Sequence, residues 1–144
     1  MSKYSAWLEI DIQQLKKNLA HIKAAYGGKR SVLAIVKANA YGHGEREVAH
    51  FLQDEVDMFG VANVHEGLEL RQANVKNPIL VLGLYTPAEC ALALQHEMTL
   101  TVSSLEMARE IQQQAKTQKI VASVHVKVDT GMGRLGFSYC DAYD

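Results

Sequence analysis

Lys37 stands directly after a short apolar run, Val32–Val36, and opens a loop-like stretch, Lys37–Gly44, that carries Tyr41 and His43. An apolar run bounded by turn residues predicts a strand buried on both faces, as in a parallel sheet. Lys37 would then lie at the carboxyl end of that strand, where parallel α/β proteins place their active sites. A partly desolvated amine there loses preference for its charged form and can form a Schiff base with an aldehyde. The alternative, which spacing alone favours, is an ordinary solvated lysine.

Three glycines, Gly131, Gly133 and Gly136, follow the last predicted strand, Val121–Val128, in the spacing G-x-G-x-x-G. This spacing indicates a dinucleotide site when it follows the first strand of a fold and opens a helix. Here it follows the last strand, and residues 137–144 do not predict a helix. We therefore expect the glycines to let the chain turn sharply across the end of the sheet, with dinucleotide binding as the alternative.

Arg134 lies inside this glycine turn, and Lys127 and Asp129 precede it. A guanidinium is planar and always charged, which suits a carboxylate or a phenolate oxygen. Because alternate residues of a strand share a face, Lys127 and Asp129 are expected to lie on the same side. Their spacing alone favours an ordinary ion pair with a neighbour.

Around these positions the sequence alternates between strands and helices. The predicted strands are Trp7–Ile10, Val32–Val36, Met58–Ala62, Ile79–Leu82, Met98–Val102 and Val121–Val128, and helices are predicted to begin at Asp11, Glu45, Asn63, Thr86 and Ser103. Such alternation predicts right-handed βαβ units and a parallel α/β sheet. An open doubly wound sheet of five strands fits the length. A (β/α)8 barrel needs about 250 residues, so this chain would hold about five of its eight strands.

The composition places limits on the function. The 144 residues carry a formal charge of −1, from 15 basic and 16 acidic side chains. No basic cluster exceeds a pair, so we expect no nucleic-acid partner. No apolar run approaches the roughly 20 residues of a membrane span, so we expect no membrane association. No secretory signal is visible, so we expect the protein to be cytoplasmic. Two cysteines make no disulfide framework, and Cys90 is expected in the core.

Two long strings carry a family resemblance. VKANAYGHG (residues 36–44) and HVKVDTGMGRLGF (125–137), together with the opening WLEIDIQQLKKNL (7–19), closely resemble alanine racemases, enzymes that use pyridoxal 5'-phosphate (PLP). The motifs occur in the family's order and span essentially the whole chain. The resemblance implies a TIM-type barrel of which residues 1–144 are the N-terminal part, with the family's C-terminal β domain absent from these residues.

The resemblance also implies roles for four residues. Lys37 would carry PLP and act as a base on one face of the substrate, and Tyr41 would contact the cofactor phosphate. Arg134 would lie by the phenolic oxygen of the cofactor and the substrate carboxylate. Lys127 is carboxylated in many members and would orient Arg134. His43 matches a motif position without an assigned role, and no metal is expected.

The family's reaction interconverts L- and D-alanine, which supplies D-alanine for bacterial peptidoglycan. It needs a second acid–base group, a tyrosine that the C-terminal β domain contributes across a homodimer interface. Because that domain is not in these 144 residues, the chain alone is expected to be inactive. The alternative function is that of a barrel-only protein that carries PLP without racemase activity.

Overall fold

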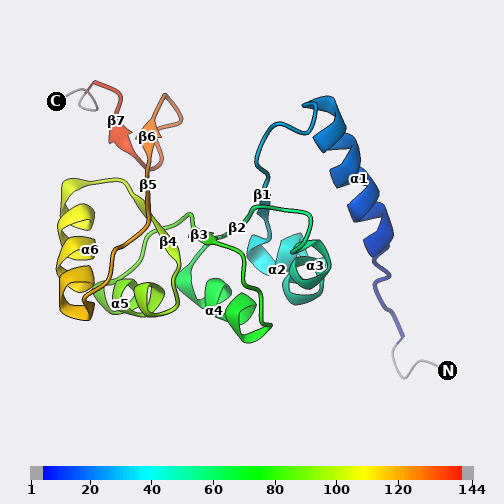
Figure 1. Ribbon diagram of the computed structural model, residues 1–144, viewed down its shortest axis with the longest axis horizontal. Helices are drawn as coiled ribbons and strands as arrows, with labels where there is room; N and C mark the ends of the chain where they lie inside the picture. The colour runs from blue at the N-terminus through cyan, green and yellow to red at the C-terminus, as the bar shows by residue number, and fades with distance from the viewer. Residues whose placement is uncertain (1–4, 141–144) are drawn as a thin grey trace.

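The computed structural model describes residues 5–140 and contains one parallel sheet with helices along one side of it (Figure 1). The sheet consists of β1 (Leu33–Ile35), β2 (Met58–Val61), β3 (Ile79–Val81), β4 (Thr99–Val102) and β5 (Val124–Val126). The helices are α1 (Ile12–Ala25), α2 (Lys37–Tyr41), α3 (Glu45–Leu52), α4 (Val64–Gln72), α5 (Pro87–Gln95) and α6 (Leu105–Gln118). A second small sheet pairs β6 (Val128–Asp129) with β7 (Phe137–Ser138).

The order of the strands distinguishes the two architectures that the sequence allowed, an open doubly wound sheet and part of a (β/α)8 barrel. The strands follow one another as β1-β2-β3-β4-β5, and every neighbouring pair is parallel. A doubly wound sheet reverses its strand order at a switch point, and this sheet does not. With right-handed crossovers, a sequential order places all the connecting helices on one face, as in a barrel.

The core lies between the sheet and the helix layer. Phe59, Val61, Ile79, Val81 and Leu100 are fully buried, and they alternate with residues that face the other side of the sheet. Cys90 is also fully buried, as predicted.

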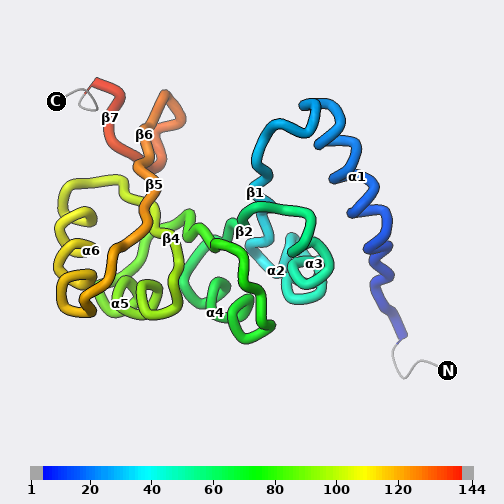
Figure 2. Tube along the Cα trace, in the orientation of Figure 1, coloured from blue at the N-terminus to red at the C-terminus, as the bar shows by residue number. Residues whose placement is uncertain are grey.

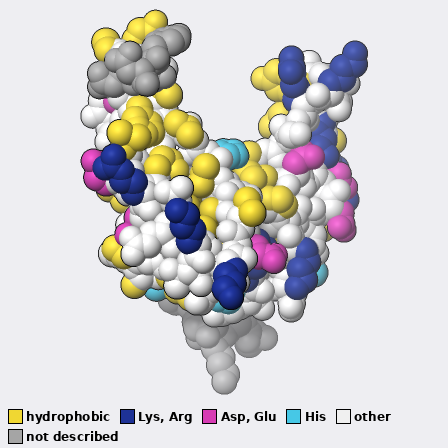
Figure 3. All heavy atoms as spheres, turned by 60° about the vertical axis from the view of Figure 1, so that its left-hand side comes forward, with side chains coloured by type: hydrophobic (Ala, Val, Ile, Leu, Met, Phe, Trp, Pro, Cys, Tyr) yellow, Lys and Arg dark blue, Asp and Glu magenta, His cyan; other side chains and the backbone are white. Residues whose placement is uncertain are grey.

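One edge of the sheet lacks such cover within the described residues. Val124 and Val126 of β5 are 41% and 65% exposed, because no helix follows β5 within residues 5–140. Figure 3 shows hydrophobic side chains gathered on the upper part of the face turned to the viewer. The β5 edge of the sheet is therefore open in the described residues, as expected for part of a barrel.

The predicted helix starts are confirmed at four of the five positions. Asp11 and Asn63 each accept a hydrogen bond from the backbone N–H three residues on, and Thr86 forms a complete capping box with Glu89. α3 begins at Glu45. The last helix begins one residue later than predicted, because Ser104 and not Ser103 accepts the hydrogen bond from Met107 N–H.

Two predicted strands are wrong. Trp7–Ile10 forms no strand; Trp7 is 68% exposed, and no neighbouring strand pairs with it in the part of the chain described. Val121–Val128 is not one long strand, because pairing with β4 lasts only over Val124–Val126. Residue 127 then leaves the main sheet, and β6 pairs with β7 instead. The hydrophobic pattern indicated the apolar run, but it carried no information on where pairing with β4 ends.

α1 stands at the β1 edge, apart from the layer of α3 to α6 (Figure 2). Lys16 of α1 forms an ion pair with Glu55 in the turn after α3, with Lys16 Nζ 2.6 Å from Glu55 Oε1. The apolar side of α1 is only partly covered, since Leu19 is buried whereas Ile22 is 53% exposed.

Arg71 of α4 holds together the turns that lead into β3 and β4. Its guanidinium donates to four backbone carbonyl oxygens, those of Val75, Asn77, His96 and Glu97, at 2.8 to 3.2 Å. These turns lie at the amino ends of the strands, the face of a barrel that serves stability.

Replacing Arg71 with methionine is expected to lower the free energy of unfolding by about 2–4 kcal/mol, because partly buried carbonyl groups lose their donor. Urea unfolding measures the change. Arg109→Met serves as the control, since Arg109 is exposed on α6 and its loss is expected to change stability by less than about 0.5 kcal/mol. Equal losses for the two variants would show that the bonds of Arg71 contribute no net stability.

Candidate active site

Three of the four candidate residues line one pocket at the carboxyl ends of the strands. Lys37 follows β1, and Lys127 and Arg134 follow β5, yet all three border a pocket of about 450 Å³. The remaining lining residues are Ala62, Leu82, Gly83, Leu84 and Leu135, from the ends of β2 and β3 and from the glycine turn. The parallel sheet thus brings together an amine, a guanidinium and a second amine that lie up to 97 residues apart (134 − 37 = 97).

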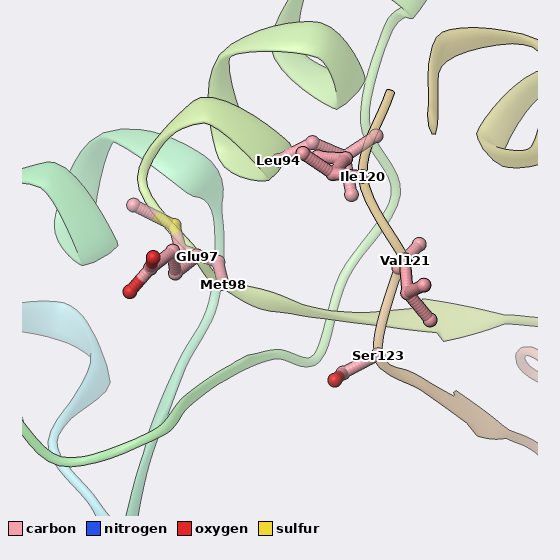
Figure 4. A pocket seen from close by; sticks show the side chains of 7 residues that line it. Leu94, Glu97, Met98, Ile120, Val121 and Ser123 are labelled. Atoms are coloured by element: carbon pink, nitrogen blue, oxygen red, sulfur yellow. The ribbon is translucent and has the colours of Figure 1, made fainter. Parts of the chain in front are cut away.

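A second pocket lies at the opposite ends of the strands and offers no comparable chemistry. Its volume is about 300 Å³, and its lining includes Leu94, Met98, Ile120 and Val121 (Figure 4). These residues precede β4 and β5 or end α5. Glu97 is its only ionisable lining residue. The pocket at the carboxyl ends, which two lysines and an arginine border, is the candidate active site.

The segment after Lys37 is a left-handed helical turn rather than a loop. Four consecutive residues, Ala38–Tyr41, have φ between 51° and 54°. For residues other than glycine this conformation costs about 1–2 kcal/mol each, with asparagine the least penalised. Only Asn39 of the four is of the favoured type. The surrounding contacts must therefore hold this turn, which directs the chain away from the strand immediately after Lys37.

Tyr41 ends this turn and does not line the pocket. Its side chain is 61% exposed, and the pocket's lining residues do not include it. The structure therefore brings Lys37, Lys127 and Arg134 together and leaves Tyr41 beside them on the outside of the turn.

The turn that carries Arg134 is organised by Asp129. One carboxylate oxygen, Asp129 Oδ1, accepts hydrogen bonds from Gly131 N–H at 2.9 Å and Gly133 N–H at 3.0 Å. The N–H groups of Gly133 and then Gly131 hold the pKa of Asp129 below its ordinary value. Asp129 thus binds backbone in its own turn, and the ordinary ion pair that spacing favoured is not found for it among residues 5–140.

Gly136 closes the same turn where a side chain would not fit. Its φ is 137°, and a Cβ atom would lie 2.6 Å from Asp129 N. β7 follows it directly, and no helix follows it in the described residues. The glycines therefore shape a turn, as expected, and the helix that a dinucleotide fingerprint requires is not present there.

Lys127 leaves the main sheet at the pocket. Its N–H donates to Val102 O at 2.8 Å, and its carbonyl accepts from Phe137 N–H at 2.8 Å. These two bonds fix the backbone of Lys127 between β4 and β7, so that its half-buried side chain borders the pocket with Arg134.

Two residues near the site were not predicted to take part in it. Glu66 accepts hydrogen bonds from the N–H groups of Ala38 and Ala62, and Asn39 Oδ1 accepts one from Glu45 N–H at 3.0 Å. In the sequence, Glu66 stands three residues after Asn63, a spacing that by itself indicates only a partner in a helix start. Burial, and secondly the charge of Glu66, raise the pKa of Glu45 above its ordinary value.

Two further kinds of site were searched for in residues 5–140. No group of three His, Cys, Asp or Glu side chains in this range is arranged to hold a metal ion. None of the helices described combines the length and the apolar character needed to cross a bilayer.

Sequential parallel strands with all connecting helices on one face define the class, a domain of the TIM-barrel type. The family follows from comparison with known proteins. Residues 10–144 match the model of the alanine racemase N-terminal domain, and the chain belongs to this family. The predicted fold, an incomplete TIM-type barrel, is confirmed.

Relatives and solved structures agree with this assignment. The alanine racemase of Methanococcus maripaludis is 44% identical over 138 residues, which cover 95% of this chain and 37% of that protein. The structure of the Clostridium difficile 630 alanine racemase in complex with cycloserine is similar with a TM-score of 0.92 at 40% identity, covering 96% of this chain and 38% of that one. The histidine racemase of Leuconostoc mesenteroides has a TM-score of 0.80 at 33% identity, covering 88% of this chain and 34% of that one. The chain thus spans well under half the length of these relatives.

Proposed function

We propose that the chain is the N-terminal part of the PLP-binding barrel of an amino-acid racemase, with alanine as its substrate. The observation that supports this most directly is the single pocket shared by Lys37, Lys127 and Arg134. The two cited alanine racemases point to alanine, while the relative named for histidine shows that the fold also occurs with another amino acid. On the same grounds we propose a cytoplasmic homodimeric enzyme that supplies D-alanine for peptidoglycan, with a C-terminal β domain beyond these residues.

The pocket residues fit PLP by their chemistry. The volume of about 450 Å³ lies within the usual range for small-molecule sites. Lys37 provides an amine for the aldehyde, and Arg134 provides a permanent cation for the phenolate oxygen. Tyr41 lies on the outside of the adjacent turn, so it would reach only the periphery of the cofactor. We propose that its hydroxyl contacts the cofactor phosphate. When bound, PLP would delocalise the negative charge that forms on the substrate Cα.

The roles of the side chains follow from this arrangement. Lys37, at the end of β1, would take the Cα proton from one face of the substrate in one direction of the reaction, and would deliver a proton to that same face in the reverse direction. Arg134 would bind the substrate carboxylate and keep it at a fixed angle to Lys37. The opposite face needs a second group, which we place in the β domain of the partner subunit. Residues 1–144 without that domain are therefore expected not to racemise alanine.

Lys127 borders the same pocket as Arg134, so two cations would face one another there. Carboxylation removes the conflict: the neutral amine adds to CO2 and releases a proton, leaving a carbamate anion beside the guanidinium. If Lys127 carries this group, Lys127→Ala lowers turnover at least about tenfold, and added acetate or formate restores part of it. A loss that small carboxylates leave unchanged would contradict carboxylation.

The experiment that tests the proposed function compares two lengths of the protein. The longer sample is the full-length protein, or a hybrid in which residues 1–144 replace the equivalent part of the C. difficile enzyme. Each sample is incubated with PLP and L-alanine, and D-alanine is measured with D-amino-acid oxidase. We expect D-alanine from the longer protein and none from residues 1–144 alone. PLP bound at Lys37 without racemisation of any amino acid by the longer protein would favour the barrel-only carrier instead.

A further inference from the structure

Glu66 connects the two strand ends on either side of the candidate site. Its Oε1 accepts a hydrogen bond from Ala38 N–H at 2.9 Å, and its Oε2 accepts one from Ala62 N–H at 2.6 Å. Ala38 directly follows Lys37, and Ala62 directly follows β2 and borders the pocket. One carboxylate therefore fixes the backbone on both sides of the pocket wall next to Lys37.

The position of Glu66 in its helix makes this contact unusual. Glu66 is the third residue of α4, and its N–H donates to the N-cap residue Asn63 at 3.0 Å. A glutamate at this position ordinarily completes a capping box by accepting from the N-cap N–H. The carboxylate of Glu66 instead accepts from Ala62 and from Ala38, which is 28 residues away in sequence.

The next βα unit contains the ordinary arrangement for comparison. Glu89 is the third residue of α5, and its Oε2 accepts from Thr86 N–H and Thr86 Oγ1, both at 2.8 Å. Two glutamates at equivalent helix positions thus differ in what they hold. Glu89 stabilises the start of its own helix, while Glu66 holds the turn that follows Lys37.

That turn requires outside support. Ala38–Tyr41 are left-handed, and three of these four residues are neither glycine nor asparagine. Ala38 is the first residue in this conformation, so its N–H sets the direction in which the chain leaves Lys37. A charged acceptor makes stronger hydrogen bonds than a neutral one, and a carboxylate at a helix N-terminus is favoured by the helix dipole.

We propose that Glu66 is a positioning residue that locks the left-handed turn after Lys37 and so directs the amine of Lys37 toward Arg134. The expected effect on cofactor loading at Lys37 rests on the proposed function. The hydrogen bonds by which Glu66 holds the turn do not depend on any cofactor. Glu66 does not line the pocket, so it acts through the backbone of its neighbours.

The test compares Glu66→Gln with the matched variant Glu89→Gln in the full-length protein or the hybrid. Glutamine keeps one acceptor oxygen and presents an N–H2 group to the second backbone donor, so one of the two bonds is lost. The fraction of Lys37 that carries PLP is measured against PLP concentration by borohydride reduction and peptide mass spectrometry. Glu66→Gln is expected to raise the half-saturating PLP concentration at least about tenfold, and Glu89→Gln to change it less than about twofold.

A second measurement needs no cofactor. Hydrogen exchange of the Ala38 amide in PLP-free protein is expected to accelerate at least about tenfold in Glu66→Gln and to stay unchanged in Glu89→Gln. If the wild-type protein takes up no PLP at Lys37, the proposed function fails, while Ala38 exchange still decides whether Glu66 locks the turn. Equal PLP loading, or equal Ala38 exchange, in both variants would overturn the positioning role.

Stability controls separate positioning from general damage. Both variants lose a carboxylate charge at the same helix position, but the amide oxygen of Glu89→Gln can still accept both bonds from Thr86. Thermal unfolding midpoints of the two variants show how much of the Glu66→Gln effect is a loss of global stability. Should Glu66→Gln fail to fold, Glu66→Asp replaces it, because aspartate keeps the charge but is one CH2 too short to span both N–H donors. Glu66→Asp with wild-type PLP loading and wild-type Ala38 exchange would also contradict the inference.

Discussion

Replacing Lys37 with alanine in the full-length protein is expected to remove PLP from the site and to lower alanine racemisation by at least about three orders of magnitude. The variant loses both the amine that holds the cofactor and the base on one face of the substrate. Lys37 is half-buried at the end of β1 and borders the pocket with Arg134. No other lysine side chain except Lys127 borders that pocket in the described residues.

The visible absorbance of bound PLP and the rate of D-alanine formation measure the two losses separately. Lys17→Ala is the control, because Lys17 is exposed on α1 and is expected to leave both signals unchanged. Added methylamine is expected to restore part of the rate to Lys37→Ala, since it supplies a small amine to the vacated space. A Lys37→Ala protein that still racemises alanine at a tenth of the wild-type rate would exclude Lys37 as the base.

That Lys37 and Arg134 lie at the same end of the sheet was predictable, because it follows from the parallel topology. Parallel strands end on one face of a sheet, so residues that follow β1 and β5 must lie at that face. The curvature of the sheet then brings them to one pocket. The change from apolar to glycine and polar residues predicted the ends of β1 to β4 to within one residue. The last strand ends at Val126, two residues before its predicted end at Val128.

The shape of the turn after Lys37 was not predictable, for a physical reason. Left-handed backbone is signalled by glycine or asparagine, and Ala38, Ala40 and Tyr41 are neither. The turn is held by tertiary contacts, such as the bond from Ala38 N–H to Glu66, which a local pattern does not contain. The sequence pattern predicted a loop here because it contains no signal for a left-handed turn.

The contacts of Glu66 were also not predictable from the local sequence. Its spacing from Asn63 matches that of Glu89 from Thr86 closely enough to predict two capping boxes. Of these two, the structure closes the box only at Thr86, whereas the carboxylate of Glu66 accepts from Ala38 N–H at a neighbouring strand end. Whether a helix-start glutamate serves its own helix or an adjoining site is decided by the fold and not by the motif.

Replacing Arg134 with alanine is the second change with a large expected effect, and it should separate turnover from cofactor binding. Loss of one preorganised charged donor typically costs about 10²–10³ in rate. We expect kcat to fall by that factor and KM for alanine to rise, because the guanidinium would bind the substrate carboxylate. PLP loading should weaken by less than about tenfold, since Lys37 remains to hold the cofactor.

Arg109→Ala is the control for the loss of an arginine, as Arg109 is exposed on α6 away from the pocket residues. Asp129→Ala provides a graded test, because Asp129 holds the turn through Gly131 and Gly133 without bordering the pocket of Lys37. Its kcat should fall less than that of Arg134→Ala, and combining the two changes should add little, since both act through the same guanidinium. Unchanged turnover in Arg134→Ala would leave Arg134 a structural residue and remove the substrate's carboxylate partner from the proposed site.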